Sequence, residues 1–133
     1  MSRFLMALAL ALASLTTSAK DIDGRHAVYG AGAQGCAQWL KVRSQEGSTV
    51  KLWIQWLEGY LSAFNVTVGN TYSIIGERGF DEVLDWLDSY CKTNPDHLFV
   101  TAVANLTVQL FPERYNLPPD RKGSSWDKWQ KGK

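Results

Sequence analysis

"FDEVLDWLDSYC", residues 80–91, has the most sharply divided helical pattern of the chain. At about 100° per residue, its apolar side chains fall on one helical face and its carboxylates on the other, with Trp86 at the border. Cys91 shares the apolar face and therefore points into the core. We expect the acidic face to be solvated. It consists of Asp81, Glu82, Asp85 and Asp88.

The chain begins with the pattern of a secretory signal peptide. Arg3 precedes an apolar run over residues 4–15, and small residues lead up to Lys20. The run is shorter than the roughly 20 apolar residues that a membrane-spanning helix needs. We therefore expect residues 1–19 to be removed as a signal peptide, which leaves an exported, periplasmic chain with no membrane span. An uncleaved signal anchor is the alternative.

The two cysteines of the chain, Cys36 and Cys91, are expected to form a disulfide. Exported proteins fold under oxidising conditions, where a pair of cysteines usually becomes a bridge. A metal site is not predicted, because the only histidines, His26 and His97, lack metal-type spacing. A reactive thiolate is not favoured either, since the carboxylates that precede Cys91 would oppose its charge. No cofactor is expected.

Two more segments, residues 33–46 and residues 50–65, have helical periodicity. Residues 50–65 are apolar over more than half of the helical wheel. This predicts a central helix packed on several sides, with Ser48 or Thr49 as its cap. A helix over residues 33–46 would turn Cys36 toward the core and so bring the two cysteines together.

The end of the domain is predicted to be helical as well. Asn94 can cap a helix over residues 95–110, with Pro95 at its first position. For residues 66–79 the sequence allows three alternatives: a helix extension, a loop or a short strand pair. Together the segments predict an all-α fold: a single small domain of about four helices, residues 20–111, closed by one disulfide.

"GAGAQG", residues 30–35, has glycines spaced like those of a dinucleotide-binding loop. That fingerprint needs a preceding strand and a βαβ unit, and neither is visible, which favours a loop or a helix cap. General acid–base catalysis needs positioned groups in a pocket, and no serine, histidine and carboxylate pattern is evident. We therefore do not expect an enzyme.

The charge balance argues against general nucleic-acid binding. The chain has 14 Lys and Arg against 13 Asp and Glu, and loss of Arg3 with the signal peptide would bring the net charge to zero. Residues 112–133 differ, with six basic and three acidic side chains, a Pro-Pro pair and two tryptophans. We expect a loose basic tail that either docks weakly or uses Trp126 and Trp129 to bind an acidic surface on this or another molecule.

The last predicted helix carries no charged side chain from Leu98 to Phe111. Its core side is predicted to consist of Leu98, Phe99, Ala102, Val103, Leu106 and Leu110. A second apolar stripe remains, formed by Val100, Ala104, Val108 and Phe111. Burial in a larger core would explain this stripe. Otherwise it is a surface for a homodimer or a protein client, because so much apolar area is unusual on a monomer.

Motifs around both cysteines resemble a known family. "WLDSYCKTNPDHLF", residues 86–99, is similar to the second-cysteine region of HdeA/HdeB-type periplasmic proteins, in which a helix ending in Tyr-Cys is followed by a basic residue and Asn-Pro. "GCAQWL", residues 35–40, is similar to their first-cysteine motif, and "WDK", residues 126–128, to the end of HdeA. The resemblance covers residues 33–111. It implies a small helical single-disulfide domain whose dimers separate at low pH and then shield unfolding periplasmic clients.

A second resemblance is to exported Tai-type immunity proteins, which neutralise secreted effectors and combine Cys-aromatic with Tyr/Phe-Cys-Pro helices. Their usual second cysteine pair is missing from this chain. Residues and resemblances together lead us to expect an exported protein-binding module. An acid-stress chaperone is the first hypothesis, and an immunity protein is the alternative. Its partners would be protein clients or one specific protein, and no nucleic acid.

Overall fold

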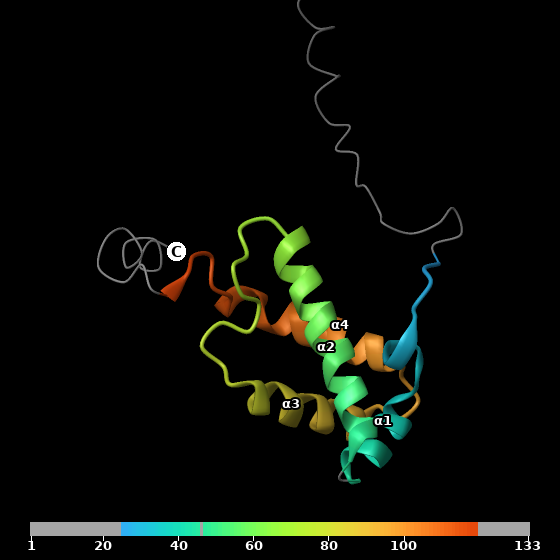
Figure 1. Ribbon diagram of the computed structural model, residues 1–133. Helices are drawn as coiled ribbons and strands as arrows, with labels where there is room; N and C mark the ends of the chain where they lie inside the picture. The colour runs from blue at the N-terminus through green and yellow to red at the C-terminus, as the bar shows by residue number, and fades with distance from the viewer. Residues whose placement is uncertain (1–24, 46, 120–133) are drawn as a thin grey trace, which may run out of the picture.

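The computed structural model describes residues 25–45 and 47–119 (Figure 1). These residues form four α-helices and two short 3₁₀ helices, and no β-strand occurs among them. The elements are η1 (Gly30–Ala33), α1 (Cys36–Arg43), α2 (Ser48–Thr67), α3 (Phe80–Thr93), α4 (Phe99–Leu110) and η2 (Phe111–Glu113). The predicted all-α fold is confirmed. The predicted signal peptide, residues 1–19, lies outside the described ranges.

A disulfide joins the first residue of α1 to the last turn of α3. The Cα atoms of Cys36 and Cys91 are 4.9 Å apart, and both side chains are fully buried. The predicted pairing is therefore confirmed. Because the two residues are 55 positions apart, the bond also restricts a long loop in the unfolded chain.

Three aromatic rings fill the core where α1, α2 and α4 meet. The ring centroid of Trp39 lies 5.8 Å from that of Trp53 and 4.9 Å from that of Phe99. Trp53 and Phe99 meet edge to face at 5.0 Å. Aromatic pairs of this kind contribute about 0.5–1.5 kcal/mol beyond the burial of their area. The cluster thus holds α2 where it crosses α4 in Figure 1.

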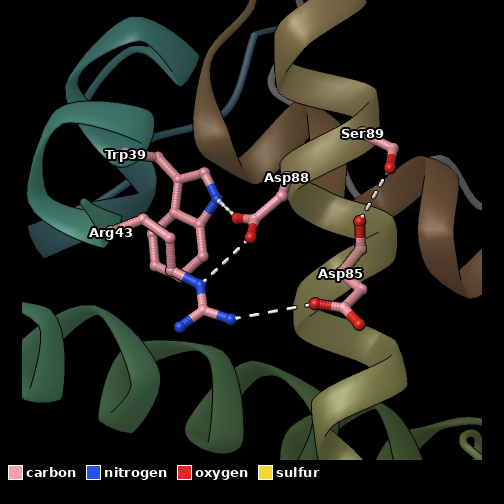
Figure 2. Close-up of polar contacts among 5 residues, drawn as sticks. All are labelled: Trp39, Arg43, Asp85, Asp88 and Ser89. Atoms are coloured by element: carbon pink, nitrogen blue, oxygen red, sulfur yellow. Dashed lines mark hydrogen bonds and ion pairs between the residues drawn. The ribbon is translucent and has the colours of Figure 1, made fainter.

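Asp88 links α3 to α1 beside this cluster (Figure 2). Its Oδ1 accepts a hydrogen bond from the indole Nε1 of Trp39 (2.8 Å), and its Oδ2 accepts one from Nε of Arg43 (3.2 Å). The Asp88 side chain is only 19% exposed, whereas that of Asp85 is 79% exposed. The expectation of a solvated acidic face was therefore wrong at Asp88, because the buried indole N–H of Trp39 needs an acceptor.

Helix α4 begins at Phe99, so the predicted start at Pro95 was wrong. The backbone of residues 95–98 pairs with the start of α1 instead of winding into a helix. The His97 carbonyl accepts a hydrogen bond from the Cys36 amide (2.8 Å), and the Phe99 amide donates to the Gln34 carbonyl (2.8 Å). These two bonds place the beginning of α4 directly beside the beginning of α1.

The residues around this junction differ from the prediction in two further ways. Asn94 closes α3 rather than opening α4, since its side-chain Nδ2 donates to the Tyr90 carbonyl (2.9 Å). Leu98 precedes the helix and is 45% exposed, although it was predicted to face the core. The other predicted core residues of this helix are buried: Phe99, Ala102, Val103, Leu106 and Leu110.

Helix α2 packs through one side, and the predicted burial on several sides was wrong. Leu52, which belongs to the predicted apolar segment, is 64% exposed. The residue before the helix is Gly47, and the predicted caps Ser48 and Thr49 lie inside its first turn. The buried side chains of α2 are Trp53, Leu57 and Leu61. No helix within the described ranges is both long and apolar enough to cross a membrane.

Of the three alternatives for the stretch 66–79, the structure contains a loop that follows the last turn of α2. Ile74 anchors it, because this side chain is 1% exposed. The Ile74 amide also donates a hydrogen bond to the side-chain Oδ1 of Asn65 (2.8 Å). The loop is therefore fixed to the end of α2 by one apolar and one polar contact.

The predicted tail begins with residues that return to this loop. Tyr115 and Ser73 form an isolated antiparallel bridge, with N···O distances of 2.9 and 3.1 Å. Nearby, Nη1 of Arg78 lies 2.6 Å from Oε2 of Glu113. The chain up to Tyr115 thus contacts the domain. Trp126 and Trp129, the two candidate binding residues of the tail, lie outside the described ranges.

Reduction of the Cys36–Cys91 bond should lower the free energy of unfolding by about 4 kcal/mol, because the chain-entropy model assigns that much to a loop of this length. Urea unfolding followed by circular dichroism, with and without reductant, measures the loss. Mass analysis of the oxidised protein should find two hydrogens missing. Two alkylatable thiols, or an unchanged midpoint after reduction, would contradict a structural role for the bond.

Replacement of Asp88 by alanine should lower the free energy of unfolding by about 1–3 kcal/mol, because the buried indole N–H of Trp39 loses its acceptor. The matched control is Asp85→Ala, which removes an exposed carboxylate and should change stability by less than about 0.5 kcal/mol. Urea unfolding of both variants measures the two losses in the free energy of unfolding. Equal losses would show that Asp88 contributes only surface charge.

Candidate protein-binding groove

An open groove lies between the segment before η1 and the helices α2 and α4. Its volume is about 490 Å³. Residues 26–29 form one wall, and α2 and α4 supply the rest through Trp56, Tyr60, Val100, Thr101 and Ala104. The lining is therefore mainly aromatic and aliphatic, which is the usual character of a site that buries apolar groups.

Trp56 is held in this groove by the glycine-rich segment of η1. Its indole Nε1 donates a hydrogen bond to the Tyr29 carbonyl (2.7 Å). Its six-membered ring occupies the space beside Gly32, where an added Cβ would lie 2.0 Å from Cζ2 of the indole. Gly30 and Gly32 of "GAGAQG" thus allow close packing against an aromatic ring, and Gly35 is the N-cap residue of α1, in agreement with the cap that the sequence favoured as one reading.

Tyr60 continues the aromatic wall one helical turn further along α2. Its ring centroid lies 5.6 Å from that of Trp56. Burial raises the pKa of the Tyr60 hydroxyl above its ordinary value of 10, so this side chain adds no charge to the groove at neutral pH. The aromatic rings are suited to holding apolar side chains.

The structure separates the predicted partner stripe of α4 into two parts. Val100 and Ala104 line the groove. Val108 lies further along the helix and is 75% exposed, while Phe111 is 39% exposed. The guanidinium carbon of Arg114 lies 3.7 Å from the centroid of the Phe111 ring, so this end of the stripe is already covered on one face by a cation.

Sequence reasoning assigned Trp56 and Tyr60 to the core of α2 and did not place either in a binding site. Tyr29, whose carbonyl accepts the hydrogen bond from Trp56, is 80% exposed. The available signal was the run of small residues in "GAGA", which leaves room for a large ring to approach the backbone. It could not identify which aromatic residue fills that room, because Trp56 follows some 24 positions later.

A polar cluster lies between α3 and α4, and none of its side chains lines this groove. The Tyr90 hydroxyl is 2.9 Å from Nδ1 of His97, and Nδ2 of Asn105 donates to the same hydroxyl (3.2 Å). The three side chains satisfy one another and connect α3 to the start of α4. Among the described residues, no group of three or more His, Cys, Asp or Glu side chains is placed to hold a metal ion.

A methyl group added at Gly32 should disturb the groove. Gly32→Ala forces Cβ into the Trp56 ring, so the free energy of unfolding should fall by about 1–3 kcal/mol. The matched control is Gly59→Ala in the middle of α2, where an added Cβ meets nothing within 4 Å and the change should stabilise the protein by about 0.5–1 kcal/mol. Urea unfolding measures both. A neutral Gly32→Ala would show that the Trp56 ring is not fixed in this position.

Comparisons of the chain with protein families, with curated proteins and with solved structures found no match. The resemblances to HdeA/HdeB-type and Tai-type proteins rest on the cysteine motifs and remain predictions.

Proposed function

We propose that the chain is an exported protein-binding module whose groove holds apolar side chains of a partner polypeptide. The observation that carries this proposal is the uncharged aromatic wall of Trp56 and Tyr60, open to solvent beside a helix, α4, that has no charged side chain. Aromatic residues dominate the energetics of protein–protein contacts. A groove of this kind fits an apolar helix face or an extended apolar segment.

Export is supported by the disulfide. Cys36 and Cys91 are bonded and fully buried, which fits an oxidising location outside the cytosol. The signal-peptide pattern of residues 1–19 extends the proposal to the periplasm. Client proteins that unfold in that compartment would then be the natural source of exposed apolar segments.

Acid activation is the specific version that we propose, following the resemblance to HdeA/HdeB-type proteins. Without Arg3 the charges cancel at pH 7, whereas at pH 2 thirteen Lys and Arg side chains, two histidines and the amino terminus give a net charge of about +16. Self-repulsion of that size loosens a compact chain. Two contacts depend on ionised carboxylates and would weaken, Arg43–Asp88 between α1 and α3 and Arg78–Glu113 beside η2.

The disulfide gives such a loosened state a fixed centre. It would keep α1 attached to α3 while the groove and the exposed face of α4 open to clients. Many proteins expose apolar surface in acid, so increased dye binding does not distinguish this function. Protection of a client protein from aggregation does distinguish this function.

The test is suppression of client aggregation at equal molar ratio, at pH 2–3 and at pH 7. We expect protection in acid and none at neutral pH, measured by light scattering of an acid-sensitive enzyme. Val100→Lys places a charge in the groove and should remove most of the protection. The matched control, Val66→Lys, changes a valine that is 85% exposed on α2 and should leave protection intact.

Failure to protect any client at pH 2–3 would overturn the chaperone version. The immunity alternative then takes its place, and it is tested by pull-down of secreted toxins at pH 7 with the wild type and Val100→Lys. A homodimer is the remaining way to cover the α4 stripe. Analytical ultracentrifugation at pH 7 detects it, and Val108→Lys should dissociate it while the helical signal is retained.

A further inference from the structure

A second groove lies between α3 and α4, on a face that the proposed function does not use. Its volume is about 370 Å³. Val83, Leu106 and Leu110, each 1% exposed, form its floor. Trp86 forms a wall, and its indole Nε1 donates to Oε1 of Gln109 across the groove (3.1 Å). The floor and wall form an apolar surface, and the volume of the groove lies within the range of small-molecule sites.

One end of this groove opens into an acidic hollow. The hollow has a volume of about 580 Å³ and shares Arg78 and Glu82 with the groove, so the two form one continuous strip. The strip has one cation, Arg78, which is paired with Glu113. Its carboxylates are Glu77, Glu82, Asp85 and Glu113. Arg43, which is not part of the lining, lies 4.0 Å from Asp85, so four negative and two positive charges leave a net charge of −2.

The part of the chain that follows the described residues has the opposite charge. Residues 120–133 read "DRKGSSWDKWQKGK", with five basic and two acidic side chains and therefore a net charge of +3. They also contain Trp126 and Trp129, whose rings match an apolar seat beside another aromatic residue. Tyr115 lines the acidic hollow. Residues 120–133 therefore follow, in sequence, a part of the chain that already lies at the strip.

We propose that residues 121–129 of the same molecule lie along this strip, with an indole of the tail in the groove beside Trp86 and its basic side chains against Glu82 and Asp85. This inference does not rest on the proposed function. It gives the α3–α4 face an occupant and leaves the groove at Trp56 and Tyr60 open for a partner.

The length of the chain allows this placement. The described residues end at Pro119, seven positions before Trp126, and a flexible segment of that length has a root-mean-square span of about 15 Å. Helix α3, with 14 residues, is about 21 Å long at 1.5 Å per residue. A tether of this length holds the tail at an effective concentration near millimolar, which favours binding within one molecule over binding between copies.

Nuclear magnetic resonance of the uniformly labelled full chain tests the proposal. The indole N–H signals of Trp126 and Trp129 should differ from unstructured values, and at least one ring should show nuclear Overhauser contacts to the methyl groups of Leu106 or Leu110. Salt at about 1 M, where the Debye length is about 3 Å, should move both signals toward unstructured values. Unstructured signals at low salt would overturn the proposal.

Matched variants separate charge from apolar contact. E82K combined with D85K reverses the rim and should release both indoles, whereas E58K on the exposed side of α2 should leave their signals unchanged. W126A combined with W129A should shift the signal of Trp86, while W126F combined with W129F should retain most contacts. Circular dichroism confirms that each variant is folded.

Dilution separates binding within one molecule from exchange between copies. The signals of a tail bound to its own domain should stay constant over an about twentyfold dilution, because the tether fixes the local concentration. Signals that move toward unstructured values on dilution would mean that the tail binds a second copy, and the intramolecular proposal would be wrong. An unchanged spectrum in E82K combined with D85K would also overturn it.

Discussion

Helix α1 has eight residues, which is too short for a helix to be stable in water by itself. It exists because three kinds of contact attach it to the rest of the chain at nearly the same place. The Cys36–Cys91 bond fixes its first residue to α3, Asp88 accepts hydrogen bonds from its Trp39 and Arg43, and the Trp39 ring packs on Phe99 of α4. Every other helix of the core touches this junction or is placed by it.

The position of α4 follows from the same junction. Because the His97 carbonyl and the Phe99 amide bond to the start of α1, α4 begins beside the disulfide and runs under α2. Its Val100 and Ala104 then face the aromatic wall of Trp56 and Tyr60. The candidate groove thus depends on backbone pairing at residues 95–98 as well as on the side chains of α4.

The elements that could be predicted are those whose signal is local. The two-sided pattern of residues 80–91 identified α3 and the inward direction of Cys91, and the export pattern gave the disulfide. The five buried residues of α4 also followed from helical spacing. In contrast, the start of α4 was mispredicted, since an Asn-Pro pair that opens many helices is used here to turn the chain against α1.

The candidate site depended on partners far apart in the sequence, which is why it was only partly foreseen. Val100 and Ala104 were selected because they stood opposite the predicted core, but no local pattern connects Trp56 with Gly32. The role of Asp88 was missed for the same reason: a carboxylate in an acidic row looks solvated until the indole that needs it, Trp39, is known to lie across from it. Leu52 shows the reverse error, because an apolar residue in a helix need not be covered.

The separation of Cys36 and Cys91 by 55 residues also bears on the order in which the domain can form. Helix α2 can reach α1 early, through Trp53 and Trp39, but the disulfide and hydrogen-bond partners of α1 on α3 follow it by 45 to 55 residues. A chain that emerges from its amino-terminal end therefore presents α1 with only α2 to pack against until α3 and the turn before α4 have appeared. Contacts between distant segments are slow to form, because the loop between them must be closed first. Folding must therefore wait for nearly the whole domain, and until then the Cys36 thiol is open to any oxidant or thiol that it meets.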